Sequence, residues 1–95
     1  MGKFKIGQLV ATRAVDERTR GDKKFYNFVA KSLKRHINCD WGDLCDEDKE
    51  SNEQALKDGG RLFSAYIFNK QTDEKIWIIT EWDRSVTTIL FPEDY

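Results

Sequence analysis

The sequence contains no long hydrophobic run, which excludes one class of protein before any motif is considered. A membrane-spanning helix needs about 20 consecutive apolar residues, and no stretch of this 95-residue chain approaches that length. The first residues, MGKFKIGQLVATR, also lack the apolar core of a signal peptide. We therefore expect a soluble cytoplasmic protein without a membrane partner.

Cysteine and histidine are scarce, with two cysteines and one histidine in the whole chain. In a reducing compartment a cysteine pair rarely forms a structural disulfide, so packing, metal binding or reactivity are the remaining uses. The sequence also lacks the P-loop, GxSxG, HExxH and glycine-rich nucleotide-binding motifs. No established catalytic motif therefore points to an enzyme.

The sequence also lacks an excess of one charge, because it has 16 Lys and Arg residues and 17 Asp and Glu residues. A net charge of −1 predicts no direct binding of nucleic acid or lipid. The distribution is uneven, however: residues 1–36 are rich in Lys and Arg, and residues 37–53 are strongly acidic. Such acids fit the first turn of a helix, and they also form a candidate surface for a protein partner. The candidate partner-binding residues are Asp46, Glu47, Asp48 and Glu50.

Hydrophobic periodicity predicts helices first and strands second. Apolar residues at helical spacing indicate an amphipathic helix over 23–37 and another helix over 46–57. Residues 6–17 fit either a short helix or a strand. Alternating β-branched and aromatic residues predict strands over 61–68, 75–81 and 86–91.

The expected architecture is a single α+β domain over residues 1–95, with about three helices packed on a three-stranded antiparallel β-sheet. The breaks between the predicted strands are short enough for hairpins. Asn52 shares a helical face with apolar neighbours, so we expect it to be half-buried and hydrogen-bonded. The aromatic residues expected where helices meet sheet are Phe25, Phe28, Tyr66, Trp77 and Phe91.

The stretch RHINCDWGDLCDED holds the only histidine and both cysteines among several carboxylates. His36, Cys39 and Cys45 are ligand types that zinc prefers, and the fourth donor would come from Asp43 or Asp40, from a side chain of another element, or from water. The spacing matches a zinc motif only in part. A second interpretation makes His36 a hydrogen-bonded core residue and both cysteines small packing residues. A third is a metal-dependent nuclease that uses His36 with Asp40 or Asp43.

The sequence also resembles the sequences of a known protein family. From Arg35 the chain reads R-H-x3-D-W-G-D-L, then E-D-K-x-x-N and A-L-K-x-G, and from Ile76 I-W-I-I-T-E-x-D-R-S-V-T-T-I-L-F-P-E-x-Y. This order, over about residues 7–95, is similar to that of short orphan proteins from phages, plasmids and integrative elements of Gram-positive bacteria, catalogued as plasmid-related proteins. It does not include Cys39 or Cys45, so a zinc site with both sulfurs would be particular to this chain.

The resemblance implies an anti-CRISPR protein that acts in the host bacterial cytosol. Such a protein inhibits a host RNA-guided (type II) CRISPR nuclease by direct protein binding that blocks DNA loading, and it needs no catalysis of its own. Because these nucleases hold nucleic acid in a positively charged channel, the acidic segment is the expected contact. A nucleic-acid-binding accessory factor that uses the basic helix over 23–35 is a further alternative.

Overall fold

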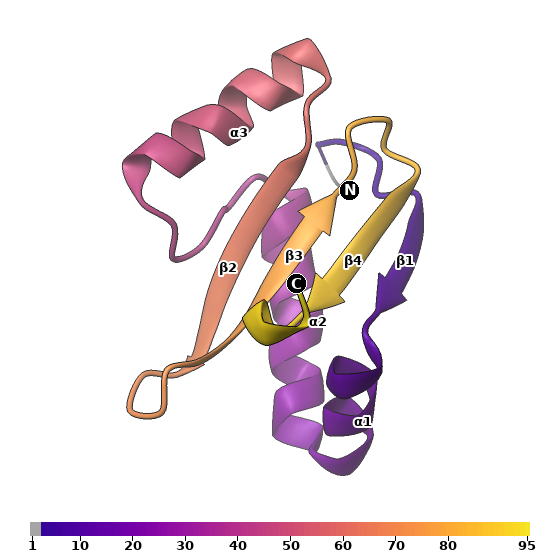
Figure 1. Ribbon diagram of the computed structural model, residues 1–95, viewed down its shortest axis with the longest axis vertical. Coiled ribbons are helices and arrows are strands. Elements are labelled where there is room, and N and C mark those ends of the chain that lie inside the picture. Colours follow the sequence, from indigo (N-terminus) through magenta and orange to yellow (C-terminus); the bar gives the residue numbers. More distant parts are fainter. Residues whose placement is uncertain (1–2) are drawn as a thin grey trace.

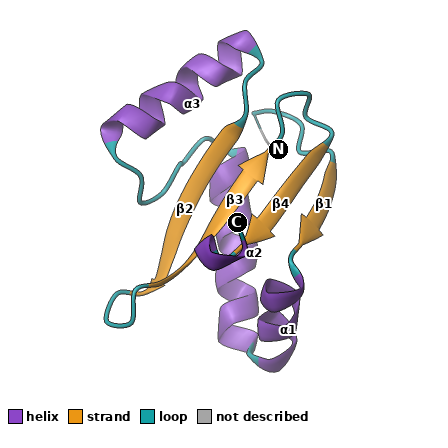
Figure 2. Ribbon diagram, viewed as in Figure 1, coloured by secondary structure: helices purple, strands orange, loops and turns teal. Residues whose placement is uncertain are grey.

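The computed structural model describes residues 3–95, which form three α-helices and a four-stranded sheet (Figure 1). The helices are α1 (Arg13–Gly21), α2 (Lys23–Ile37) and α3 (Asp46–Asp58). The strands are β1 (Gln8–Ala11), β2 (Leu62–Asn69), β3 (Glu74–Thr80) and β4 (Val86–Leu90), and a 3-10 turn, η1 (Pro92–Asp94), follows β4 (Figure 2). The general α+β class is therefore as predicted.

The sheet is mixed, which corrects the prediction of three antiparallel strands. Its strand order is β1-β4-β3-β2, with antiparallel β2–β3 and β3–β4 pairs and a parallel β1–β4 pair. Residues 6–17 are not one element, because Gln8–Ala11 is extended and the side chain of Thr12 then caps α1 by accepting the Val15 N–H. The partner of β1 lies near the other end of the sequence, so local periodicity gave no sign of it.

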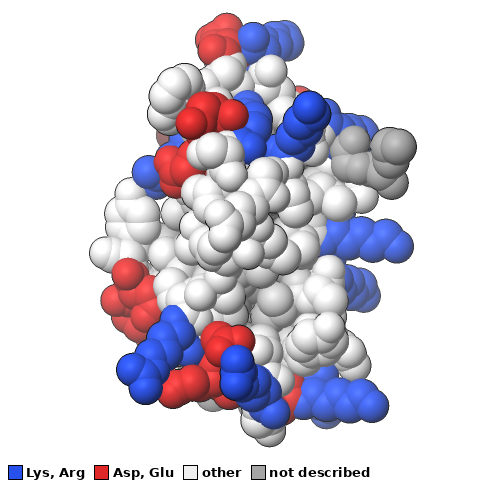
Figure 3. Space-filling view, turned by 90° about the vertical axis from the view of Figure 1, so that its right-hand side faces the viewer, with Lys and Arg blue, Asp and Glu red and all other residues white. Residues whose placement is uncertain are grey.

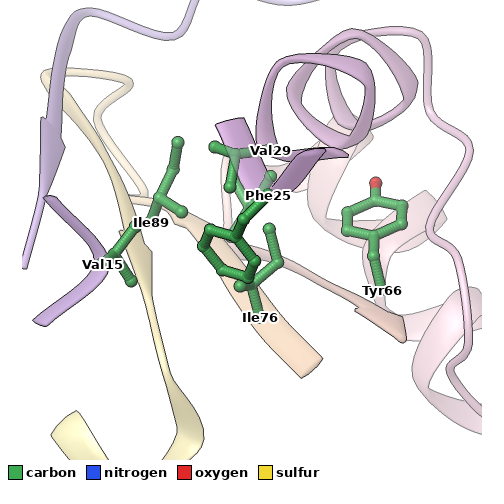
Figure 4. Close-up of a cluster of buried hydrophobic side chains, with 7 residues drawn as sticks. Val15, Phe25, Val29, Tyr66, Ile76 and Ile89 are labelled. Atoms are coloured by element: carbon green, nitrogen blue, oxygen red, sulfur yellow. The ribbon is translucent and has the colours of Figure 1, made fainter. Parts of the chain in front are cut away.

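Helix α2 covers one face of the sheet, with α1 beside it (Figure 1). Side chains from both helices and from the sheet meet there in the larger hydrophobic cluster (Figure 4). Its buried members are Val15, Phe25, Val29, Tyr66, Ile76, Ile78 and Ile89. Each large apolar side chain that is fully buried contributes about 1.5–3 kcal/mol, so this cluster is the main source of stability.

The predicted burial of the aromatic residues holds only in part. Phe25 and Tyr66 are fully buried, as expected, and Phe28 and Phe91 are half-buried at the margin of the larger cluster. The placement of Trp77 was wrong, because alternation along β3 directs its neighbours Ile76 and Ile78 toward α2 and leaves Trp77 on the opposite face. There the Trp77 ring packs edge-on against Phe63 and Tyr95.

Helix α3 does not lie on the sheet face but beside β2, at the edge of the sheet (Figure 2). A smaller cluster of buried residues, Trp41, Ala55 and Leu62, joins α3 to that edge. The helix ends at Gly59, whose left-handed backbone (φ 79°) lets its N–H bond to the carbonyl of Ala55.

Candidate functional site

His36 lies in the last turn of α2 and is completely buried, so the side chain of the only histidine does not reach solvent. Its Nδ1 is 2.5 Å from the Ser64 hydroxyl, and its Nε2 is 2.9 Å from the Thr80 hydroxyl. Thr80 is in turn 2.7 Å from the Thr87 hydroxyl, which donates to the carbonyl of Ile6 at 2.7 Å. A continuous hydrogen-bonded chain therefore crosses the sheet from β2 to β4.

The direction of this chain follows from its last member, because a carbonyl oxygen can only accept. Thr87 donates its one proton to the carbonyl, so it must accept from Thr80. Thr80 has then used its proton and must accept from Nε2 of His36. His36 therefore carries its proton on Nε2, and its Nδ1 accepts from Ser64.

The surroundings of His36 favour the neutral ring. Phe4 and Trp41 pack against it edge-on, with ring centroids 5.3 and 5.7 Å away. Burial lowers the pKa of His36 from its usual 6.5 to about 4. With both ring nitrogens occupied and no access from solvent, His36 has the properties of a core histidine rather than those of a catalytic base or metal ligand.

The two cysteines are not brought to His36 as a ligand set. Cys39 is half-buried beside the smaller cluster, and burial raises the pKa of its thiol. Cys45 is exposed at the N-cap position of α3. Within residues 3–95, no three His, Cys, Asp or Glu side chains are grouped closely enough to hold a metal ion. This arrangement does not favour the predicted zinc site of His36, Cys39, Cys45 and Asp43, which stays a prediction.

The α2–α3 loop (residues 38–45) instead closes the outer edge of β2. The Ala65 N–H donates to the carbonyl of Trp41 at 3.3 Å, and the Asp43 N–H donates to the carbonyl of Ala65 at 2.7 Å. The carboxylate of Asp43 accepts the next free N–H of the strand, from Ile67, at 3.0 Å. Asp43 thus protects an edge that would otherwise be open to pairing with another strand.

Asn52 of α3 protects the same edge of β2 at Phe63, two residues before Ala65. Its side-chain amide donates to the carbonyl of Phe63 at 2.6 Å, and its side-chain oxygen accepts the Phe63 N–H at 3.0 Å. The side chain therefore pairs with β2 as a neighbouring strand would. The hydrogen bonding expected from the sequence is confirmed, and Asn52 is more deeply buried than the predicted half-buried position.

Asp40 also has a local structural role. Arg35 donates to its carboxylate through Nε at 2.7 Å and Nη2 at 3.1 Å, and this pairing lowers the pKa of Asp40. The backbone carbonyl of Asp40 accepts from the hydroxyl of Tyr66 at 2.7 Å. The stretch that looked most like a catalytic or metal site is therefore used to join α2, the sheet edge and α3.

The candidate partner-binding residues have a different environment. Asp46, Glu47, Asp48 and Glu50 are all exposed on the first two turns of α3. None of the four forms an ion pair with another side chain of residues 3–95. The three earliest acids suit the positive end of the helix dipole, but their exposed carboxylates stay free to meet a partner.

The basic residues predicted on the helix over 23–37 are on another part of the surface. Helix α2 covers one face of the sheet, and its outer surface carries four exposed lysines, Lys23, Lys24, Lys31 and Lys34. Figure 3, which looks at the β1 side of the molecule, shows Lys and Arg side chains projecting on the right, where α2 lies, and a largely uncharged centre. The charge asymmetry of the sequence is thus also an asymmetry of the surface.

An open hollow of about 1100 Å³ lies between α1, the turn after β2, and η1. Its charged side chains largely satisfy one another, since Arg18 bonds to Glu74 and Asp22, and Lys75 pairs with Asp73. None of the predicted site residues lines it.

Sequence reasoning missed the strand residues that hold His36. Ser64, Thr80 and Thr87 are all buried polar residues that point toward α2. The available signal was a polar residue at the inward position of an otherwise apolar strand, repeated in all three predicted strands. Such residues must find buried hydrogen-bond partners, and His36 was the one ionisable group on the apolar face of the predicted helix.

Comparison of the chain with protein-family models, with curated proteins and with solved structures finds no match. The resemblance to phage- and plasmid-borne proteins therefore stays a prediction. In the part of the chain that the structure describes, no helix has the length and apolar character to cross a bilayer.

Proposed function

We propose that this chain is a binding protein without catalytic activity of its own, and that it docks the exposed acids of α3 on a basic surface of a nucleic-acid-binding protein. The first target to test is a host RNA-guided CRISPR nuclease of type II, as the resemblance implies. Inhibition would follow because the bound protein blocks the positively charged channel through which DNA is loaded.

The observation that carries this proposal is the group of exposed carboxylates at Asp46, Glu47, Asp48 and Glu50, which form no ion pair within residues 3–95 and lie on a well-anchored helix. Helix α3 is fixed to the sheet edge by the two Asn52 hydrogen bonds and by the smaller cluster. Fixed charges lose less conformational entropy on binding than mobile ones. Complementary charge also accelerates encounter with a basic partner and disfavours acidic partners.

The enzyme alternative gains no support from the site geometry. A nuclease that uses His36 with Asp40 or Asp43 needs these groups to face a substrate, but His36 is buried and both carboxylates are engaged by neighbouring groups. We do not propose an accessory factor that binds nucleic acid through the lysines of α2. A variant of these lysines serves as the control in the experiment below.

The test is a DNA-cleavage assay with a reconstituted, guide-loaded type II nuclease and equimolar inhibitor across a salt series. In one variant, Asp46→Asn, Glu47→Gln, Asp48→Asn and Glu50→Gln are combined, which removes four charges and keeps side-chain volume. The matched control neutralises the same number of charges on α2, with Gln in place of Lys23, Lys24, Lys31 and Lys34.

We expect wild-type inhibition to weaken as salt rises, the α3 variant to inhibit poorly, and the α2 variant to match the wild type. Equal inhibition by the α3 variant would refute the acidic docking surface. No inhibition by the wild type, against several effector types, would refute the nuclease-inhibitor function itself. Inhibition lost only in the α2 variant would instead favour the nucleic-acid-binding alternative.

A further inference from the structure

The three tryptophans of the chain differ in what they do for the fold. Trp41 is buried against Phe4 and His36, and its Nε1 donates to Glu53. Trp77 packs against two other rings on the open face of the sheet. Trp82, in the turn between β3 and β4, is 67% exposed, and its ring makes no aromatic contact or side-chain hydrogen bond within residues 3–95. The fold has no evident use for this side chain.

The turn that carries Trp82 is nevertheless tightly held. The Arg84 N–H donates to the carbonyl of Glu81 at 2.9 Å, and the carboxylate of Asp83 accepts from both the N–H and the hydroxyl of Ser85. The side chains of Asp83, Arg84 and Ser85 are thus directed toward the turn itself or the body of the protein. A large ring on a rigid turn loses little freedom when it binds.

Arg84 also connects this turn to α3. Its guanidinium donates to the carbonyl of Gly60 at 2.6 Å and to that of Ala55 at 3.2 Å. The turn therefore sits at the C-terminal end of the helix whose first turns carry the free acids, as Figure 1 shows. Because the Arg84 guanidinium lies against carbonyls, the charged groups on either side of Trp82 are the carboxylates of Glu81 and Asp83.

We propose that Trp82 is the apolar anchor of the same docking surface, and that it inserts into an apolar pocket rimmed by Lys or Arg on the basic partner of α3. This inference rests on the proposed function. Tryptophan is among the residues most enriched at the energetic centres of protein interfaces, and the faces of its ring attract cations. Steering by α3 and anchoring by Trp82 are separable contributions, because salt screens the exposed charges strongly and affects the burial of an uncharged ring much less.

The experiment compares Trp82→Ala with Tyr26→Ala in binding to the guide-loaded nuclease at several salt concentrations. Tyr26 is a matched control because it is 59% exposed and lies on α2, away from the proposed surface. Neither ring is packed in the core, so both variants should fold, which circular dichroism and the melting temperature will verify.

For Trp82→Ala we expect the dissociation constant to rise about 30-fold, as for an interface hot spot, with the salt dependence unchanged. Neutralising the α3 acids should instead flatten the salt dependence, and Tyr26→Ala should have no effect. Unchanged affinity of Trp82→Ala beside weakened binding by the α3 variant would overturn the anchor but not the docking surface. No binding by the wild type would overturn both.

A second copy of the chain is the other possible occupant of the Trp82 surface. Sedimentation of the wild type alone distinguishes this case. A concentration-dependent dimer that disappears in Trp82→Ala would show that the ring docks on a second copy, and it would overturn the basic partner as its target.

Discussion

At the scale of single residues, His36 shows how a buried polar network fixes a protonation state. The chain of hydroxyl groups through Thr80 and Thr87 ends on the carbonyl of Ile6. Because this carbonyl can only accept, it determines which group donates in each hydrogen bond of the chain. We therefore predict the Nε2–H tautomer. Because His36 is the only histidine, ¹⁵N NMR of the imidazole reports on it without ambiguity. A ring protonated on Nδ1, or one that titrates near 6.5, would contradict the network.

The same residue makes stability depend on pH. In the unfolded chain the pKa of His36 is about 6.5, whereas in the fold it is lowered to about 4. Between these values the unfolded state binds more protons, so acid shifts the equilibrium toward it. Stability from this group is complete above pH 6.5 and is lost as the pH falls through 4, a change of about 3 kcal/mol.

Denaturant unfolding of the wild type and of His36→Gln, measured from pH 7.5 to 4, tests this dependence. The variant should be less stable at neutral pH and should lose less stability on acidification. The carboxylates of Asp22, Asp40 and Asp83, whose pKa values are also lowered, contribute in both proteins and cancel in the difference. Parallel pH profiles of the two proteins would show that His36 is not the titrating group.

The role of His36 was only half predictable from the sequence. Helical spacing placed it on the buried face of α2, which the structure confirms. Its partners Ser64 and Thr80 come from strands that are remote in the sequence, and only the folded sheet brings them to both ring nitrogens. The nearby cysteines and carboxylates fitted a zinc site by composition alone, because spacing does not show that Asp43 turns toward β2.

At the scale of elements, the α2–α3 loop is a predicted weak point because Gly42 lies against β2. Its φ is 76°, and a Cβ at this position would stand 2.1 Å from the backbone oxygen of Ala65. Gly42→Ala must therefore displace the loop from the strand edge and lose the hydrogen bonds of Asp43. Gly59 is the matched control, since its φ is 79° but the added carbon would meet no other part of the fold within 4 Å.

For Gly59→Ala we expect a loss of about 1–2 kcal/mol from backbone strain alone. Gly42→Ala should cost clearly more, because the same strain is joined by the steric clash. Equilibrium unfolding in urea measures both free energies. Similar losses in the two variants would show that the loop adapts to the extra carbon and that its contact with β2 is less rigid than the structure indicates.

Prediction of elements succeeded where packing follows local periodicity and failed where it depends on distant partners. The apolar stripe of α2 and the alternation in the three later strands gave the correct elements. Strand β1 is only four residues long, and its apolar residues also fitted a helical spacing. Trp77 was assigned to the helix-covered face because it is apolar, although its neighbours in β3 already occupied that face.

At the scale of the whole molecule, the two hydrophobic clusters are unequal. The larger one joins α1, α2 and the sheet with seven buried residues, and the smaller one joins α3 and the loop to β2 with three. Helix α2 buries four of its side chains, whereas α3 buries two, Asn52 and Ala55. Elements with fewer buried contacts open at lower free energy, so α3 should open before α2.

Hydrogen–deuterium exchange tests this order directly. We predict that amides of α3 exchange faster than those of α2 and β3. Arg84→Met provides a matched perturbation, because it removes the hydrogen bonds to Ala55 and Gly60 and should accelerate exchange in α3 while leaving α2 unchanged. Equal protection of both helices would mean that the domain opens only as one unit. A partner that docks on α3 would bind its closed form only, so binding should slow exchange in α3 more than in any other element.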